Sequence, residues 1–401
     1  MKITRRLFAF LAFTASLAVL ALAGAASRPA ASHSYLAFVG TYTNKTDSKG
    51  IYAYEFDAET GKLTAKGLAV ETPDPSFVAI HPNGKFVYAV NESGKQSAVS
   101  AFSLDAHSGK LTLLNQLPAL GEDPCYITFD KTGKYVFVAN YTSGNIVVFP
   151  VLAHGKLGEH TALLTDAGVV GPNKERQDGP HAHWTGLSAS NRFAYVADLG
   201  LDRVFIYNFD AAKGTLARGE APSSNTEANS AEPSDAFSAT LSPGTGPRHV
   251  AFSPNGKFMY VLGELQSTVT VFASDARETY RQIQSISALP EGFSGRNDAA
   301  EIALHPSGRW LYISNRGHDT IAAFAVDSEK GILRKTGDFP TGGKEPRHFA
   351  IDPTGQFLLA ENQHSNSIVV FSIDSSTGAL TQVSKTDGVP SPVCLVFLPT
   401  P

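Results

Sequence analysis

The sequence has no large excess of charge of either sign and no long hydrophobic run beyond its N-terminus. Its 33 Lys and Arg side chains are nearly matched by 37 Asp and Glu side chains, which gives a net charge of −4. This weak acidity argues against a nucleic-acid partner, because phosphate binding needs a basic surface. Beyond residue 30 no apolar run is long enough to span a membrane. We therefore expect no membrane partner once the N-terminal segment is removed.

Cysteine is almost absent, and so are the common motifs of nucleophilic and nucleotide-dependent catalysis. The two cysteines, Cys125 and Cys394, fall in comparable segments of repeats that are not neighbours. We therefore expect both to be buried and not to form a disulfide. Neither has the local signature of a catalytic thiol. The chain contains no Gly-x-Ser-x-Gly elbow, P-loop or dinucleotide fingerprint, so a functional site must be sought in another arrangement of side chains.

The N-terminus has the pattern of an export signal. Lys2, Arg5 and Arg6 precede an apolar run over residues 7–23, and small residues follow at 23–26. This pattern predicts a signal peptide over residues 1–26 that is not part of the fold. The twin arginines also fit a twin-arginine signal, and a general secretory signal is the alternative. We expect a bacterial protein that is periplasmic or secreted.

A short phrase recurs along the rest of the chain. It joins a Pro-x-Gly-Lys-like turn to an aromatic residue, an apolar run and often an asparagine. Copies begin at Pro82, Lys131, Pro254, Pro306 and Pro353, and a degenerate copy begins at Ala189. A unit that recurs at roughly 40–50 residues indicates a propeller or a solenoid.

Each repeat contains four short strand patterns separated by turn residues. Six complete units begin near residues 75, 124, 180, 247, 299 and 346. Residues 35–70 supply three further strands, and residues 393–397 supply the missing first strand. We therefore predict an all-β, seven-bladed β-propeller over residues 34–401, closed by pairing the two ends of the chain. A monomer is expected.

Two insertions interrupt the repeat, at residues 171–179 and 221–246. Both precede the first strand of a unit, so we expect both on the same side of the disc.

Aligning the repeats isolates positions where charged residues replace the common type. These positions lie at the start of first strands and directly after second strands, which are antiparallel neighbours, so the residues should meet at one mouth of the central channel. They are His183, Arg248, Arg347, Glu264, Arg316 and Glu92. Arginines could bind a carboxylate or phosphate and stabilise an oxyanion. Glu264 could act as a general base and His183 could transfer the second proton, which predicts hydrolysis of a small anionic ester or lactone.

Other interpretations of these residues remain open. The Arg–Glu pairs could simply satisfy one another, and His249, Glu301 and His348 could be satisfied polar groups between blades. Asparagines that end second strands, such as Asn315, could only cap turns. His181 and His183 resemble a metal pair but have no clear third ligand, and calcium bound by mouth oxygens is the better metal hypothesis. We expect no metal and no cofactor.

Phrases in every blade resemble the seven-bladed propeller lactonases, which include bacterial 6-phosphogluconolactonases of the propeller type and fungal carboxy-muconate cyclase. Among them are Gly40-Thr41-Tyr42-Thr43, Gly179-Pro180-His181-Ala182-His183, Gly246-Pro247-Arg248-His249 and Pro346-Arg347-His348-Phe349. The resemblance implies catalytic roles for His183, Arg248, Glu264 and Arg316, without a metal or organic cofactor. We expect the substrate to be bound by His181, Arg347, Glu92, Gln363 and Asn315.

The favoured function is a metal-independent lactonase that acts on a small anionic lactone or sugar acid lactone. The export signal puts a cytoplasmic sugar phosphate in doubt as its substrate. Alternatives are a muconate-type cycloisomerase, a non-enzymatic exported binding propeller and a calcium-dependent lactonase. A tight pair between Glu264 and Arg316 in the free protein would favour the binding propeller.

Overall fold

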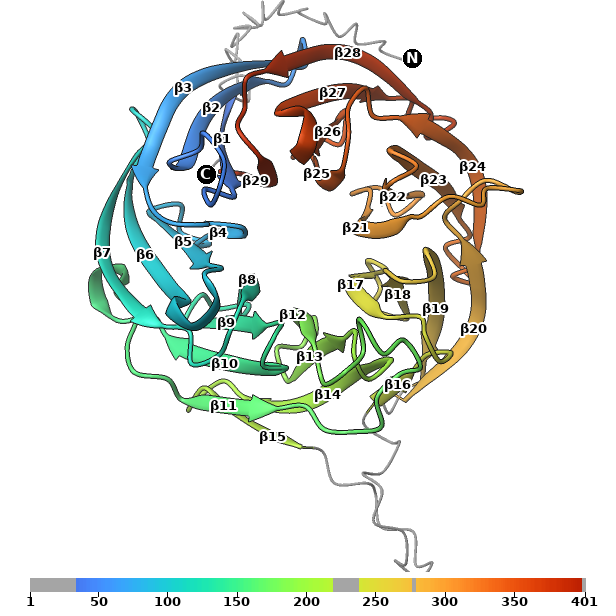
Figure 1. Ribbon diagram of the computed structural model, residues 1–401, viewed down its shortest axis with the longest axis horizontal. Coiled ribbons are helices and arrows are strands. Elements are labelled where there is room, and N and C mark those ends of the chain that lie inside the picture. Colours follow the sequence, from blue (N-terminus) through green and yellow to red (C-terminus); the bar gives the residue numbers. More distant parts are fainter. Residues whose placement is uncertain (1–33, 219–237, 276–278, 399–401) are drawn as a thin grey trace, which may run out of the picture. The chain divides into compact units, whose positions relative to one another are not determined.

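Seven antiparallel sheets are arranged in a ring around a common axis in the computed structural model (Figure 1). The structure describes residues 34–218, 238–275 and 279–398. The seven-bladed propeller prediction is confirmed, whereas the predicted signal peptide lies outside the described residues. No helix within these ranges has both the length and the hydropathy needed to cross a membrane.

The blades are numbered here in chain order, and each is given from its inner to its outer strand. Blade 1 has β4 (Val78–Ile80), β5 (Phe86–Asn91), β6 (Ala98–Asp105) and β7 (Lys110–Pro118). Blade 2 has β8 (Pro124–Phe129), β9 (Tyr135–Asn140), β10 (Asn145–Pro150) and β11 (Ala162–Thr165). Blade 3 has β12 (Ala182–Leu187), β13 (Phe193–Asp198), β14 (Arg203–Asp210), β15 (Thr215–Arg218) and β16 (Ser238–Thr240). Blade 4 has β17 (Pro247–Phe252), β18 (Phe258–Gly263), β19 (Thr268–Ser274) and β20 (Tyr280–Ser287).

The remaining blades complete the ring. Blade 5 has β21 (Asp298–Leu304), β22 (Trp310–Arg316), β23 (Thr320–Val326) and β24 (Leu333–Pro340). Blade 6 has β25 (Pro346–Ile351), β26 (Phe357–Asn362), β27 (Ser367–Ile373) and β28 (Leu380–Asp387). Blade 7 has β29 (Pro392–Phe397), β1 (Ser34–Thr41), β2 (Gly50–Asp57) and β3 (Lys62–Glu71). Within the described ranges, short 3₁₀ helices occur in three connections: η1 (Gly94–Gln96), η2 (Ala153–Gly155) and η4 (Gln363–Ser365).

The two ends of the chain close the ring. Strand β29 pairs with β1 in the register Ala37↔Phe397, Phe38↔Val396 and Val39↔Leu395. Blade 7 therefore takes its inner strand from the C-terminus and its other three strands from the N-terminal part of the chain, as the sequence predicts.

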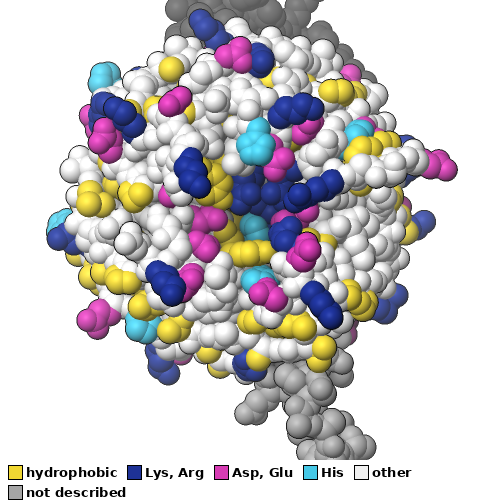
Figure 2. Space-filling model, viewed as in Figure 1, with side chains coloured by type: hydrophobic (Ala, Val, Ile, Leu, Met, Phe, Trp, Pro, Cys, Tyr) yellow, Lys and Arg dark blue, Asp and Glu magenta, His cyan; other side chains and the backbone are white. Residues whose placement is uncertain are grey.

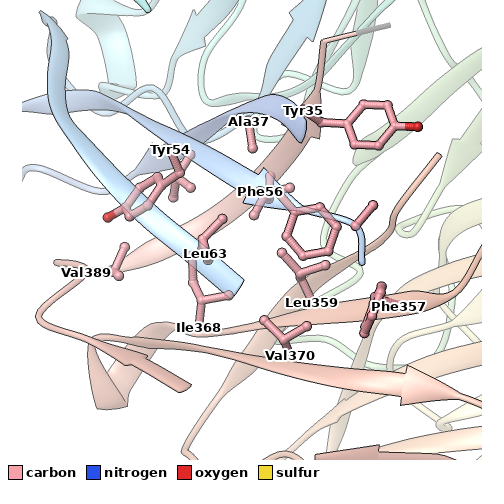
Figure 3. Packing of buried hydrophobic residues seen from close by; sticks show 13 residues of the cluster. Tyr35, Ala37, Tyr54, Phe56, Leu63, Phe357, Leu359, Ile368, Val370 and Val389 are labelled. Carbon is pink, nitrogen blue, oxygen red and sulfur yellow. The ribbon is translucent and has the colours of Figure 1, made fainter. Parts of the chain in front are cut away.

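The hydrophobic core lies between neighbouring blades. Between blades 6 and 7, Phe56 packs with its ring 5.7 Å from that of Phe357, and Leu359 and Val370 join the same cluster (Figure 3). Second strands such as β9 are buried along their whole length, whereas most residues of outer strands such as β7 are exposed or only partly buried. This gradient follows from position, because an inner strand is covered on both faces and an outer strand only in part.

The recurring phrase forms the hairpin between the first two strands of a blade. Gly84, Gly133, Gly256, Gly308 and Gly355 all have φ between +69° and +74°, a conformation that glycine adopts without strain. In the degenerate copy Asn191 occupies this position with φ of 58°. Asparagine tolerates the left-handed region better than most residues, which explains why the blade keeps its hairpin.

The second insertion includes a short strand, β16, that the sequence did not predict. Residues 219–237 lie outside the described part of the chain, but the two ends of this segment are placed by β15 and β16. Both strands pair with β14, Tyr207 with Arg218 and Phe205 with Ser238. The residues on both sides of this segment therefore belong to the outer part of blade 3. That the two insertions lie on the same side of the disc stays a prediction.

Cys125 and Cys394 are both buried and unpaired, as predicted.

Candidate functional site

Irregular register recurs where inner strands begin, at the channel end that we call the mouth. The pairing of inner and second strands shifts at Cys125, His183, Arg248, Ala300 and Arg347. Such bulges redirect side chains and often lie beside active sites. They turn the positions isolated by the repeat alignment toward the channel. Figure 2 shows basic, acidic and histidine side chains around the hollow at the centre of the ring.

Glu264 lies at the centre of the mouth cluster and is surrounded by arginines. One carboxylate oxygen lies 3.0 Å from Nε of Arg248, and the other lies 3.1 Å from Nη2 of Arg316. A third arginine, Arg176, approaches the second oxygen to 2.6 Å. The Glu264 side chain is only 4% exposed. The structure thus brings together three residues that the sequence predicted, and adds a fourth.

Two of the three arginines are also fixed by backbone carbonyls. Nε of Arg316 donates a hydrogen bond of 3.0 Å to the carbonyl of Asp298. Nη1 of Arg248 donates to the carbonyl of Ala300. Both carbonyls belong to β21, so blade 5 fixes the direction of both guanidinium groups.

The electrostatic environment fixes the charge of Glu264. Burial opposes its ionisation, but Arg316, Arg248 and Arg176 outweigh burial and hold the pKa of the carboxyl well below its usual range. Burial and the positive charge of Arg316 lower the pKa of Arg248 to about 10, against the attraction of Glu264. Glu264 is therefore a carboxylate at any pH of interest, and all its charge is engaged by arginine.

The His183 side chain is uncharged near pH 7, unlike that of Glu264. Burial, Arg248 and His249 all lower the pKa of its imidazole well below the usual value, so the ring is neutral near pH 7. Its Nδ1 is buried and has no hydrogen-bond partner among the described residues. The ring lies 5.2 Å from His249 and 5.6 Å from Tyr141, measured between centroids. A neutral imidazole with an unused nitrogen is suited to accept a proton.

A chain of alternating histidines and glutamates lies beside Arg248. Nδ1 of His249 is 2.9 Å from Glu301, whose carboxylate is 3.4 Å from Nε2 of His348. Nδ1 of His348 is in turn 2.7 Å from Glu361. Burial opposes the charge of Glu301, but His249 and His348 outweigh it and lower the pKa of this carboxyl to about 2.

These groups are satisfied by contacts between neighbouring blades, as the alternative interpretation expected: His249 of blade 4 and His348 of blade 6 both contact Glu301 of blade 5. The three residues also line a small cavity of about 10 Å³ together with residues of blades 1, 2 and 7. The bulge at Arg248 lets both Arg248 and His249 reach the channel.

The sequence and the fold both match known proteins. The family model of the seven-bladed β-propeller lactonases matches residues 36–397. The 6-phosphogluconolactonase of Bacillus subtilis is 36% identical over 365 residues, which cover 91% of this chain and 98% of that protein. The 6-phosphogluconolactonase of Formosa agariphila is 35% identical over 78% of this chain and 85% of its own. The periplasmic gluconolactonase of Pseudomonas aeruginosa superposes with a TM-score of 0.82, at 32% identity, over 92% of this chain and all of that one.

The chain belongs to the seven-bladed β-propeller lactonase family. That membership covers nearly the whole of the described ring, so the mouth cluster belongs to the family's own fold and not to an added domain.

The other expected binding residues of this propeller lactonase occupy different places. Nη2 of Arg347 donates a hydrogen bond of 2.9 Å to the hydroxyl of Tyr42, which donates one of 2.9 Å to Glu92. Burial raises the pKa of Glu92, while Arg347 opposes this shift. Gln363 lines a surface groove of about 790 Å³ together with Tyr42 and Glu92.

Two expected binding residues are held by other contacts. Asn315 is fully buried, and its amide donates to the carbonyl of Ala288 and accepts from Asn297. These contacts attach Asn315 to the connection between β20 and β21. His181 stacks on Tyr141 and contacts Asp178 through Nε2. Among the described residues, no group of three or more His, Cys, Asp or Glu side chains has the arrangement of a metal site.

Sequence reasoning missed Arg176 and Tyr42. Arg176 comes from the first insertion, which has no counterpart in the other repeats, so alignment of the repeats could not assign it a place. Its only signal was a run of charged residues directly before the His181-Ala182-His183 phrase. Tyr42 lay one residue beyond the aligned position Thr41 in blade 7.

Proposed function

We propose that this protein hydrolyses a small anionic lactone, of which 6-phosphogluconolactone is the first candidate. The observation that carries the proposal is that a neutral buried imidazole, His183, lies within the electrostatic influence of Arg248, one of the arginines gathered around Glu264 at the mouth. The relatives named for 6-phosphogluconolactone hydrolysis support this substrate class.

In the proposed mechanism His183 accepts a proton from water as the water oxygen bonds to the lactone carbonyl carbon. Arg248 and Arg316 stabilise the negative charge that develops on the carbonyl oxygen. Collapse of this intermediate breaks the bond to the ring oxygen. The proton on His183 then passes to that oxygen, and the product is an open-chain hydroxy acid.

The contacts of the two side chains favour His183 over Glu264 as the group that accepts this proton. Glu264 is held by three arginines and is a weak base in this state. Its proposed role is to fix the arginines that bind the substrate. The unpaired Nδ1 of His183 supports the transfer of the proton to the imidazole.

The test is hydrolysis of 6-phospho-D-glucono-1,5-lactone by the purified protein, with and without chelator. We expect turnover in both conditions, and a loss on the order of 100-fold for Arg248→Ala, comparable with removing an oxyanion donor. Arg309→Ala is the matched control, because Arg309 lies in a hairpin over Trp310 and away from the mouth. Unchanged turnover in Arg248→Ala would exclude this mechanism, and loss with chelator would favour the calcium-dependent lactonase.

The Glu264–Arg316 pair is also what a non-enzymatic binding propeller would show. Membership of the lactonase family favours hydrolysis over this alternative. Binding of 6-phosphogluconate without turnover of any lactone would reverse that preference.

We also propose that the protein is exported. The basic and apolar pattern of residues 1–26 supports this, as does the likeness to a periplasmic gluconolactonase. In a fractionated bacterial host, the full chain should appear outside the cytoplasm in a form shortened by about the length of that segment. Retention in the cytoplasm at full length would contradict the proposal.

A further inference from the structure

Glu264 is sealed from solvent in the free protein. Its side chain is 4% exposed, and those of Arg248 and Arg316 are 3% and 9% exposed. Arg176 lies outermost and is 32% exposed. A substrate that uses Arg248 and Arg316 at the proposed site must therefore first displace one of the groups that cover them.

Arg176 is the group best able to move. Arg248 and Arg316 are held by carbonyls of β21, as described above. The guanidinium of Arg176 instead contacts side chains. It pairs with Glu264 at 2.6 Å, lies 3.6 Å from a carboxylate oxygen of Asp298, and approaches the Tyr141 hydroxyl to 3.4 Å. Each of these contacts can be exchanged for a ligand without moving the backbone.

The base of the Arg176 side chain is firmly anchored. Gln177 is 1% exposed, and its amide donates a hydrogen bond of 2.9 Å to the carbonyl of Leu199. The side-chain oxygen of Gln177 accepts from the backbone of Asn173, whose own side chain accepts from the backbone of Arg176. These hydrogen bonds therefore hold the backbone of the inserted loop in place, and the long cationic side chain of Arg176 extends from it over the mouth.

We propose that Arg176 is a substrate-operated latch that makes the site select anionic lactones. In the free protein it closes over Glu264. An incoming phosphate or carboxylate group competes with Glu264 for the guanidinium and draws Arg176 onto itself, which uncovers the site. A neutral lactone offers Arg176 no replacement anion, so opening the site costs free energy that is not recovered. This inference rests on the proposed lactonase function.

The test compares kcat/KM for 6-phospho-D-glucono-1,5-lactone and for D-glucono-1,5-lactone in wild type and Arg176→Ala. For the phosphorylated substrate we expect a loss of roughly 10- to 100-fold, the range for one hydrogen bond to a charged group. For the neutral lactone we expect kcat/KM to rise, because the latch no longer has to be opened. Arg176→Lys should recover part of the lost preference.

Arg296→Ala is the matched control. Arg296 also pairs with Asp298, at 3.2 Å, but its side chain is 88% exposed. This substitution should leave the ratio of the two kcat/KM values unchanged. An equal loss for both lactones in Arg176→Ala, or an unchanged ratio, would overturn the latch.

The latch and the lactonase function can fail separately. If the wild type hydrolyses neither lactone, the proposed function fails, and calorimetric titration with 6-phosphogluconate and gluconate then tests the latch. Arg176→Ala should weaken binding of 6-phosphogluconate selectively. Equal weakening for both ligands, or no binding of 6-phosphogluconate by the wild type, would overturn the latch.

Discussion

At the scale of single residues, one side chain of the mouth carries a fixed negative charge and another is available for proton transfer. Glu264 carries a negative charge that arginines hold in place, whereas His183 is kept neutral by burial and by Arg248. Two titratable groups whose environments move their pKa values in this way can take different roles at one pH.

This separation predicts an unusual pH profile. If neutral His183 accepts the proton, kcat/KM should fall with acid only below the ordinary histidine pKa, because the pKa of His183 is lowered. Activity should therefore persist in mildly acidic buffer, and a stopped-flow pH series corrected for spontaneous lactone opening would show it. An acidic limb at or above the ordinary histidine pKa would contradict the assignment. His183→Gln should remove the limb together with most of the activity.

Sequence reasoning at this scale located residues but not their surroundings. The repeat alignment isolated Arg248, Glu264 and Arg316, because each breaks a pattern shared by other blades. It could not place His249, since a bulge cannot be inferred from alternation along a strand. It could not place Arg176, because an insertion has no counterpart with which to be aligned.

At the scale of elements, the hairpin of the repeated phrase depends on backbone conformation. A Cβ added to Gly256, with φ of +69°, would meet no atom within 4 Å. A Cβ added to Gly133, with φ of +73°, would lie 2.8 Å from Nε2 of His81 in the neighbouring blade. That nitrogen also contacts the Gly133 carbonyl at 2.9 Å.

The two glycines therefore form a matched pair for mutation. Gly256→Ala should lower the free energy of unfolding by about 1–2 kcal/mol, the cost of a left-handed conformation alone. Gly133→Ala should cost more, because the new methyl group must also displace the His81 ring. Urea denaturation of both variants would measure the difference. If both variants lost the same free energy of unfolding, the contact between His81 and Gly133 would contribute little to stability.

The sequence predicted these elements well because each blade repeats the same residue types at the same positions. Glycine or asparagine marks the hairpin, and apolar runs mark the buried strands. The sequence did not predict that two short strands, β15 and β16, both pair with β14 at the outer edge of blade 3. Neither strand is long enough to be recognised from the pattern alone.

At the scale of the whole molecule, the ring distributes its core among the interfaces between blades. Seven clusters of buried side chains join neighbouring sheets, and the cluster of Figure 3 joins blades 6 and 7. The mouth cluster takes Glu264 and Arg248 from blade 4, Arg316 from blade 5 and Arg176 from the connection before blade 3. The relative positions of these side chains therefore depend on how several blades pack in the ring, and a single blade could not form the cluster.

The pairing of β29 with β1 has a consequence for how the chain is made. Residue 37 is among the first of the ring to be synthesised, yet its partner, residue 397, is among the last. A ribosome must therefore release almost the entire chain before the ring can close, and until then blade 7 lacks its inner strand. If the chain is threaded through a membrane channel unfolded, this delay helps, because the chain cannot lock into its final shape before translocation begins.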